Sequence, residues 1–247
     1  MDIRLDGKVA LVVAASRGIG KAIAAEFANS GAAVMLVSRK QDALDRAAAE
    51  IGGNVATYAA NAGDTDAADA AVAATIERFG RLDILVNNAG TNPYAGPTLE
   101  IDAARYDKTF QVNLRGPLFW CQAAWRRSFK QNPGVIVNVE SVGGLRAGGA
   151  LGVYNVTKAG LIHLTRQLAS ELGPTRVVGV APGLIDTEFS AMLVENFGDA
   201  FVRSLPLKRL GQPQDVAALA VFLASDHASW ITAETFVVDG GAGVRNV

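Results

Sequence analysis

The sequence predicts an α/β protein with a doubly wound parallel sheet of about seven strands, flanked by helices. Short runs rich in valine, isoleucine and leucine recur along the chain, and stretches with helical spacing lie between them. The runs are almost continuously apolar, which indicates burial on both faces, as in a parallel sheet covered by helices. Half of the 247 residues are hydrophobic, which suits a sizeable core.

Each expected strand is a short apolar run, and a segment such as GKAIAAEFANS, after the first run, has the spacing of an amphipathic helix. The expected strands are KVALVV (8–13), AVMLV (33–37), VATYA (55–59), LDILVN (82–87), GVIVNV (134–139), RVVGVA (176–181) and TFVVDG (235–240). One long break, residues 182–213, opens with Pro182 and Gly183. Its length predicts a mobile lid that carries a short helix over a substrate.

The charge balance and the scarcity of cysteine and histidine exclude several classes of function. The net charge is −1, so the chain offers no field for nucleic acid or an acidic membrane. Cys121 stands alone, and His163 and His227 are the only histidines, so we expect no internal disulfide and no metal site. The first apolar run is too short for a secretion signal, and no run approaches a spanning helix, so we expect a cytoplasmic protein.

A glycine-bearing turn follows the first expected strand in VVAASRGIGKAIAAEF. Strand, turn and amphipathic helix in this order are the setting of a dinucleotide-binding turn, because the free N–H groups of the helix start suit a pyrophosphate. Gly18 and Gly20 are expected to permit close approach of the phosphates, although a plain tight turn would also use glycine. Ala14 departs from this pattern, since it occupies the place of the leading glycine.

The end of the second expected strand indicates which dinucleotide binds. NAD-binding turns place an Asp or Glu there for the ribose hydroxyl, whereas this chain reads Ser38-Arg39-Lys40. Arg17 in the turn can join Arg39 in holding a 2′-phosphate, so NADP(H) is favoured over NAD(H). The alternative is that both arginines are merely solvated.

A tyrosine and a lysine four residues apart, in VYNVTKAG, predict the chemistry. On a helix Tyr154 and Lys158 lie on one face, and Ser141 lies thirteen residues before the tyrosine beyond a glycine-rich loop. A nearby ammonium stabilises phenolate, so we expect the pKa of Tyr154 to lie well below 10. The phenol would then exchange a proton with a carbonyl oxygen that the Ser141 hydroxyl holds.

Together these motifs resemble the short-chain dehydrogenase/reductase family over essentially the whole chain. The resemblance rests on ASRGIG, NNAG (87–90), VNLRG (112–116), ESVGG, YNVTK and APGLIDT, in the family's order and spacing. It implies a Rossmann-type domain over residues 1–247, with a dinucleotide-binding half of about 1–140 and a catalytic and lid half of about 141–247. It also implies that Asn113 joins Ser141, Tyr154 and Lys158 in the catalytic set by anchoring a proton-relay water.

The resemblance further implies a cofactor-binding set, in which Asn88–Gly90 lie by the adenosine and Ile185 and Thr187 hold the nicotinamide amide. The set comprises Ser16, Arg17, Gly18, Ile19, Gly20, Ser38, Arg39, Lys40, Asn61, Ala62, Asn88, Ala89, Gly90, Tyr154, Lys158, Pro182, Gly183, Ile185 and Thr187, and no metal ligand. Two further departures from the family pattern are Asn61, where an Asp often lies beside the adenine, and Ala233, which replaces a usual glycine.

Features such as SRKQ, Asn92-Pro93 and RLGQP are similar to those of NADP-dependent carbonyl and retinal reductases. They favour an NADP(H)-dependent carbonyl reductase acting on a small molecule. The alternatives are a 3-oxoacyl thioester reductase, with acyl-carrier protein as a possible partner, and a catalytically silent dinucleotide-binding protein. The resemblance also implies a homotetramer, paired through helices over residues 103–131 and 153–172.

Five other residues invite interpretation. Arg146 can meet an anionic substrate group, but an exposed arginine needs no ligand. His163 is expected to be packed or interfacial, because Tyr154 already has the role of proton donor. Trp120, Cys121 and Trp125 lie in one apolar stretch, which indicates core or subunit contact for all three.

Overall fold

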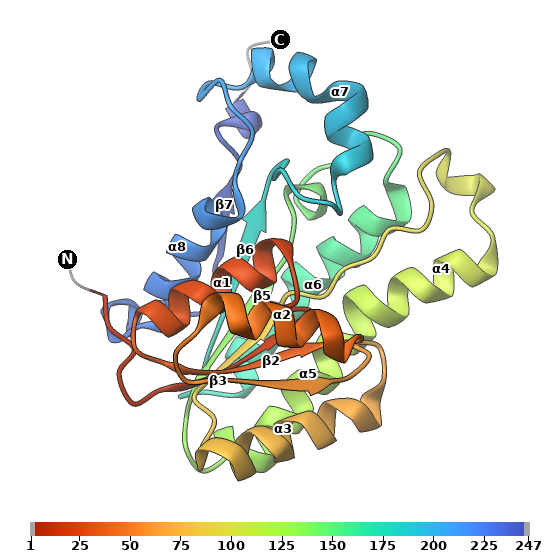
Figure 1. The fold of residues 1–247 in the computed structure, drawn as a ribbon. Helices are drawn as coiled ribbons and strands as arrows, with labels where there is room; N and C mark the ends of the chain where they lie inside the picture. Colours follow the sequence, from red (N-terminus) through yellow and green to blue (C-terminus); the bar gives the residue numbers. More distant parts are fainter. Residues whose placement is uncertain (1–2, 245–247) are drawn as a thin grey trace.

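A seven-stranded parallel sheet forms the middle layer of the molecule (Figure 1). The computed structural model describes residues 3–244, so the predicted domain limits at 1 and 247 lie outside the described residues. The strands are β1 (Val9–Val13), β2 (Ala33–Ser38), β3 (Val55–Ala59), β4 (Ile84–Asn87), β5 (Val135–Val139), β6 (Arg176–Pro182) and β7 (Thr235–Val238). All seven expected strands and the doubly wound α/β class are therefore confirmed.

Helices cover both faces of the sheet, as the continuous apolarity of its strands requires. One core cluster joins the sheet to α1 (Gly18–Asn29), α2 (Gln41–Ile51) and α8 (Pro213–Ala224). A second cluster on the other face joins it to α3 (Thr65–Phe79), α5 (Gly116–Ala124) and α6 (Gly152–Glu171). Figure 1 shows these two layers, with α4 (Ala103–Phe110) extending to one side and α7 (Ala191–Ser204) beyond the carboxyl end of β6.

The strand order places a crevice where the direction of winding reverses. The order is β3-β2-β1-β4-β5-β6-β7, so the chain moves outward from β1 to β3 and then returns to begin again at β4. In doubly wound sheets ligands bind at this switch point, outside the carboxyl ends of the strands. The glycine turn after β1 and the NNAG motif at the end of β4 both reach this point.

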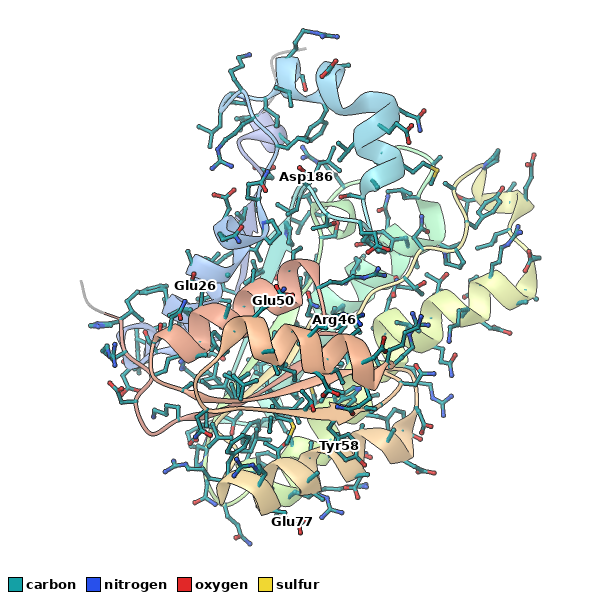
Figure 2. The ribbon with its side chains drawn as sticks, in the orientation of Figure 1. Glu26, Arg46, Glu50, Tyr58, Glu77 and Asp186 are labelled. Carbon is teal, nitrogen blue, oxygen red and sulfur yellow. The ribbon has the colours of Figure 1, made fainter. Side chains whose placement is uncertain are left out.

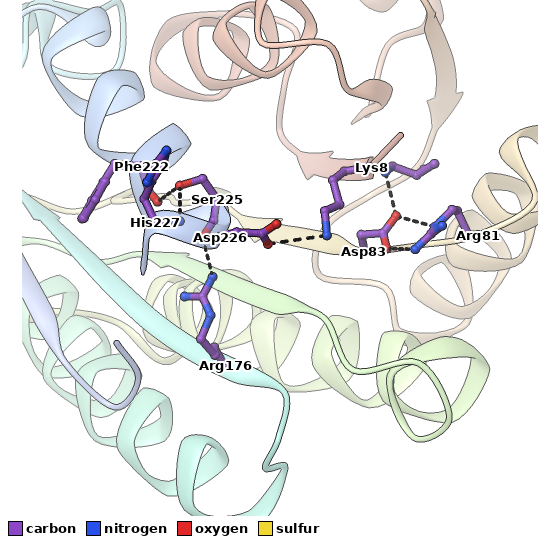
Figure 3. Close-up of polar contacts among 9 residues, drawn as sticks. Lys8, Arg81, Asp83, Arg176, Phe222, Ser225, Asp226 and His227 are labelled. Carbon is purple, nitrogen blue, oxygen red and sulfur yellow. Dashed lines mark hydrogen bonds and ion pairs between the residues drawn. The ribbon is translucent and has the colours of Figure 1, made fainter. Parts of the chain in front are cut away.

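Polar contacts link the loops at the opposite, amino end of the sheet (Figure 3). Asp83 accepts a hydrogen bond of 2.8 Å from the main chain of Val9 and pairs with Arg81. Arg176 donates to the carbonyl oxygen of Ser225 at 3.2 Å. These contacts tie the strand starts to the neighbouring loops.

Two expected elements differ in the structure. The expected long helix from residue 103 is interrupted by a π-helical turn at Gln111–Arg115, and a second follows α5 at Trp125–Phe129. Pro117 lacks an N–H, so the regular ladder cannot return a hydrogen bond to the carbonyl of Asn113. The lid helix α7 has 14 residues and is not short. Figure 2 labels Asp186, which lies in the connection between β6 and α7.

Candidate active site at the carboxyl end of the sheet

Three predicted catalytic side chains meet just beyond β5. Ser141 lies two residues after the strand, and Tyr154 and Lys158 lie one turn apart near the start of α6. The Ser141 hydroxyl hydrogen-bonds the Tyr154 phenol, and Lys158 Nζ lies 5.8 Å from the centroid of the Tyr154 ring. The sheet edge thus brings together residues separated by a glycine-rich loop in the sequence.

Asn113 braces the site from the π-helical turn. The residue is fully buried, and its side-chain oxygen accepts a bond of 2.8 Å from the N–H of Thr91. Its amide nitrogen donates to the Thr91 carbonyl at 2.9 Å and to the Thr157 hydroxyl at 3.1 Å. The side chain therefore links the loop after β4 to helix α6. Its role toward a water stays a prediction.

Burial dominates the electrostatics of the tyrosine–lysine pair. It raises the pKa of Tyr154 to about 12, although the hydrogen bond from Ser141 acts in the opposite direction. It lowers the pKa of Lys158 to about 8, against an attraction to Glu140 that raises it. The expectation that the pKa of Tyr154 lies well below 10 is therefore wrong for the ligand-free protein. At this separation the loss of hydration outweighs the ammonium charge.

The start of α1 fits the phosphates of a dinucleotide. The helix begins at Gly18, which has a left-handed φ of +57°, and Arg17 at the cap position makes no side-chain capping bond. The first turn contains no acidic residue. The first N–H groups and the positive end of the helix dipole are therefore free to meet an anion. A hydrogen bond of 3.0 Å between the Ser16 and Ser38 hydroxyls fixes this turn against the end of β2.

The two arginines expected at the 2′-phosphate have different surroundings. Arg17 forms an ion pair with Glu188 in the lid. Arg39 and Lys40 are exposed at the start of α2. Ile19 is partly buried behind them in α1. The carboxylate of Glu188 thus occupies one of the two guanidinium groups that the sequence assigns to the cofactor.

Gly20 and Asn88 hold the turn together by close packing and hydrogen bonds. The Asn88 amide donates to the carbonyl oxygens of Val13 and Ala14, at 3.3 and 3.1 Å. A Cβ at position 20 would lie 2.4 Å from Asn88 Nδ2 and 2.5 Å from the Ala14 oxygen. Packing by itself therefore requires glycine at position 20, and the approach of a phosphate to it stays a prediction. Ala14 itself has a φ of +60°, which glycine tolerates better.

The residues expected around the adenosine follow the carboxyl ends of β3 and β4. Asn61 is exposed, and its side-chain oxygen accepts a bond of 3.1 Å from Gly63. The Ala62 carbonyl accepts one of 3.0 Å from the Trp120 indole. Ala89 is buried, whereas Gly90 is exposed, and a Cβ at position 90 would lie 3.9 Å from Lys158 Nζ. Gly90 therefore borders both the crevice and the catalytic lysine.

The lid contacts both ends of the site. Above the phosphate turn, the Thr187 methyl group lies 3.6 Å from where a Cβ on Gly18 would be. At the chemical end, the exposed ring of Phe189 lies 6.2 Å from the Tyr154 ring. Ile185 is buried and forms an isolated parallel β-bridge with Gly211.

Pro182 and Gly183 connect β6 to this lid. Pro182 ends the strand, and its inclusion in β6 moves the start of the predicted break by one residue. A Cβ on Gly183 would lie 2.8 Å from Asp239 Cβ, so the chain passes close to the segment after β7. Ala233, before β7, has a φ of +63°, which is the conformation that the usual glycine adopts readily.

The remaining candidates are structural. Arg146 donates to the carbonyl oxygen of Ala242 at 3.1 Å and lies 3.6 Å from the carboxylate of Asp239, so it anchors the segment after β7. Cys121 is buried beside Asn87, and burial raises its pKa to about 12. Trp120 is buried and Trp125 is partly buried, both in the core. His163 is exposed on α6, so it is not packed within this chain, and an interfacial position stays a prediction.

Sequence reasoning missed Glu140, a buried carboxylate directly before Ser141. The available signal was an acidic residue that continues an apolar strand, since buried acids are rare without a partner. It also missed Thr157, whose hydroxyl meets Asn113, and Glu188, whose pairing with Arg17 depends on the position of the lid.

Over residues 3–244, no helix has both the length and the apolarity needed to cross a membrane. Within the same range, no group of three His, Cys, Asp or Glu side chains is arranged to hold a metal ion.

Comparison with known proteins agrees with this arrangement. A family model described as Enoyl-(Acyl carrier protein) reductase matches residues 13–243. Dehydrogenase/reductase SDR family member 4 of Homo sapiens is 38% identical over 248 residues, covering 98% of this chain and 89% of the relative. Tropinone reductase-like 3 of Erythroxylum coca is 36% identical and covers 98% and 95%.

Solved structures agree with the fold. A short-chain dehydrogenase/reductase SDR:Glucose/ribitol dehydrogenase from Brucella melitensis superposes with a TM-score of 0.92 at 35% identity, covering 98% of this chain and 99% of that one. A short-chain dehydrogenase/reductase from Serratia marcescens gives a TM-score of 0.90 at 34% identity, covering 97% and 99%. The chain therefore belongs to the short-chain dehydrogenase/reductase family, whose members act on alcohol and carbonyl groups with NAD or NADP.

Proposed function

We propose that this protein is an NADP(H)-dependent carbonyl reductase, with Asn113, Ser141, Tyr154 and Lys158 as its catalytic set. The observation that carries the proposal is the meeting of Ser141, Tyr154 and Lys158 at the sheet edge, with the lid residue Phe189 beside the tyrosine. The names of the relatives support it, since one is a dehydrogenase/reductase and another is tropinone reductase-like.

Ser141, Tyr154 and Lys158 have separate roles at the carbonyl oxygen. Hydride exchange at the carbonyl carbon is the chemistry that a bound nicotinamide supplies. The Ser141 hydroxyl holds the carbonyl oxygen, and the Tyr154 phenol gives its proton to that oxygen as negative charge develops there. The ammonium of Lys158 stabilises the phenolate that results, and alcohol oxidation follows the same steps in reverse. Phe189 shields the reacting atoms from water.

The preference for NADP(H) is proposed from the cations around the first turn. Arg39 and Lys40 are exposed beside it, and the chain has no carboxylate at the end of β2 to accept a ribose hydroxyl. Arg17 reaches the 2′-phosphate by exchanging its partner Glu188 for the ligand. That exchange costs little, because both side chains are about two-thirds exposed.

The charge distribution on the surface gives little support to the alternative, reduction of 3-oxoacyl thioesters. Docking of an acidic carrier protein needs free cations near the site. The basic cluster Arg126, Arg127 and Lys130 contains one arginine that Asp69 already pairs. The neighbouring Ser128 binds the Leu82 carbonyl ahead of β4, at the amino end of the sheet and away from Tyr154.

A substrate panel tests the proposal and its alternatives together. Purified protein is assayed with NADPH and with NADH against diketones, retinal-like aldehydes, sugars and 3-oxoacyl thioesters. We expect oxidation of NADPH with diketones and aldehydes at higher kcat/KM than with thioesters. Higher kcat/KM with 3-oxoacyl thioesters would establish the alternative. Cofactor binding without turnover of any carbonyl or alcohol would establish the catalytically silent protein.

We also propose a homotetramer. An apolar groove of about 850 Å³ lies along α4 and α6 and includes Phe110, Leu114, Leu118 and Leu164. A second copy with the same helices can cover it in a two-fold contact. Light scattering at micromolar concentration is expected to give four chains, and a monomer would contradict the proposal.

A further inference from the structure

Glu140 places a buried acid at the chemical end of the site. It follows β5, and its N–H donates to the Val180 carbonyl at 2.7 Å, so the sheet fixes its main chain. The side chain is buried, and the Thr165 hydroxyl on α6 donates to its Oε1 at 2.7 Å. The second oxygen, Oε2, is buried without a hydrogen-bond partner. A buried acid with an unpaired oxygen is costly, so its presence beside Ser141 calls for a role.

The space for this carboxyl group is provided by a glycine on the neighbouring strand. A Cβ on Gly179 would lie 2.3 to 2.4 Å from the carboxyl carbon and both oxygens of Glu140. Any other residue at position 179 would displace the acid. Strand and side chain are therefore matched, and the carboxyl group has one available position, against α6.

The main chain joins this acid to the catalytic lysine. Lys158 Nζ donates to the Val139 carbonyl at 2.8 Å, and that carbonyl belongs to the peptide bond that leads into Glu140. Lys158 and Thr165 are seven residues apart, so they lie on the same face of α6. The ammonium and the carboxyl group thus lie in one buried layer between β5 and α6.

The two charges act on one another. Burial is the larger influence on each, lowering the pKa of Lys158 and raising that of Glu140, and their mutual attraction opposes both shifts. Arg166 on α6 also acts on Glu140, and β6 places Gly179 against its carboxyl group. The Thr165 hydroxyl, which donates to Glu140, favours the carboxylate form. Tyr154 is the other titratable group that faces Lys158.

We propose that Glu140 is a positioning residue, whose buried carboxylate holds Lys158 as an ammonium ion beside the Tyr154 phenol. This inference rests on the proposed function, because only a charged lysine stabilises the phenolate form of the proton donor. Glu140 touches neither substrate nor cofactor in this role. It acts through Lys158, so its loss changes the pH at which the site works.

Two measurements test the role. In ligand-free protein labelled with ¹³C at lysine Cε, the Lys158 resonance is assigned by its absence from Lys158→Met and is titrated with pH. In Glu140→Gln, which keeps the shape, we expect Lys158 to titrate about one pH unit below its wild-type value of about 8. The alkaline limb of kcat/KM for NADPH, with saturating carbonyl, is expected to move in the same direction by a similar amount.

The controls separate charge from shape. Glu140→Asp keeps the charge, so Lys158 is expected to titrate close to its wild-type pH in this variant. Glu171→Gln, at the exposed end of α6, is expected to leave the Lys158 titration unchanged. If Glu140→Gln does not fold, Thr165→Val removes the hydroxyl that supports the carboxylate, and Lys158 is then expected to titrate below wild type by a smaller amount.

Unchanged Lys158 titration in the folded Gln variant, or in Thr165→Val if the Gln variant does not fold, would overturn the proposal. So would an Asp variant that behaves like Gln. Because the titration needs no turnover, it stands even if the wild type reduces no carbonyl. Failure of the proposed function is therefore seen separately.

Discussion

The phosphate side and the chemical side of the site use different kinds of chemical group. On the phosphate side, the ligand is offered backbone N–H groups at an uncapped helix start and exposed cations such as Arg39. On the chemical side, Lys158 and Glu140 are buried, and burial shifts the pKa of each. Affinity for an anion needs only accessible donors, whereas proton transfer needs groups held away from water.

Most of the buried polar atoms that lack a hydrogen-bond partner also lie on the chemical side. Among the described residues, five buried side-chain atoms have no hydrogen-bond partner: four lie in Glu140, Asn155, Thr235 and Asp239, around β5, α6 and β7, and the fifth lies in Asn87, at the end of β4. Unpaired buried polar groups in native proteins often mark functional sites. A single change is therefore expected to have a larger effect here than on the phosphate side.

The largest effect is expected from Tyr154→Phe. It removes only the hydroxyl that exchanges the proton, so turnover is expected to fall by about 10²- to 10⁴-fold, the usual contribution of a general acid. NADPH affinity, measured by calorimetry, is expected to stay within about twofold, because a one-hydroxyl change leaves the phosphate side intact. An undiminished rate in this variant would mean that the proton donor lies elsewhere.

The next effect concerns Lys158, whose pKa burial lowers from 10.5 to about 8. Between these values the unfolded chain binds a proton that the folded protein has released, so the free energy of unfolding rises with pH. From pH 8 to 10 the wild type is expected to gain up to about 3 kcal/mol relative to Lys158→Met. Urea unfolding of both proteins at pH 7, 8, 9 and 10 measures this gain. A difference in the free energy of unfolding that stays constant with pH would contradict the burial of this charge.

On the phosphate side, Arg39→Asp is expected to weaken NADPH binding by about ten- to a hundredfold, the worth of one or two charge-assisted hydrogen bonds. NADH binding is expected to strengthen or stay unchanged, since the new carboxylate can accept a ribose hydroxyl. Arg78→Asp, at the exposed end of α3, makes the same charge change at a distance. Equal losses of NADPH affinity in the two variants would mean that only the net charge of the protein matters.

The smallest effect is expected from Ala14→Gly and Ala233→Gly. Both alanines have left-handed φ values, +60° and +63°, where a Cβ costs about 1–2 kcal/mol and glycine costs backbone entropy instead. Each change is expected to stabilise the protein by about 0.5–1 kcal/mol, or about 2 °C in Tm for a chain of this size. Thermal unfolding of both variants measures this, with kcat expected to be unchanged. A lower Tm would show that the methyl groups contribute packing.

Local sequence patterns were enough to predict the fold class and the identity of the chemical groups. Seven apolar runs became seven parallel strands because a strand buried on both faces must be apolar throughout. Tyr154 and Lys158 were expected on one helix face because helical spacing is local, and the glycine turn was expected at a helix start for the same reason.

Tertiary structure decided what depends on distant contacts. The pKa of Tyr154 lies above the expected range because its hydration is set by the elements around it and not by its neighbour in the helix. The packing requirement at Gly20 comes from Asn88, which lies at the end of another strand and fills the space beside it. Arg17 was assigned to a phosphate, and the lid supplies Glu188 as its partner. Glu140 acquires its position only when Gly179 on the adjacent strand leaves room, since burial and pairing belong to the assembled layers.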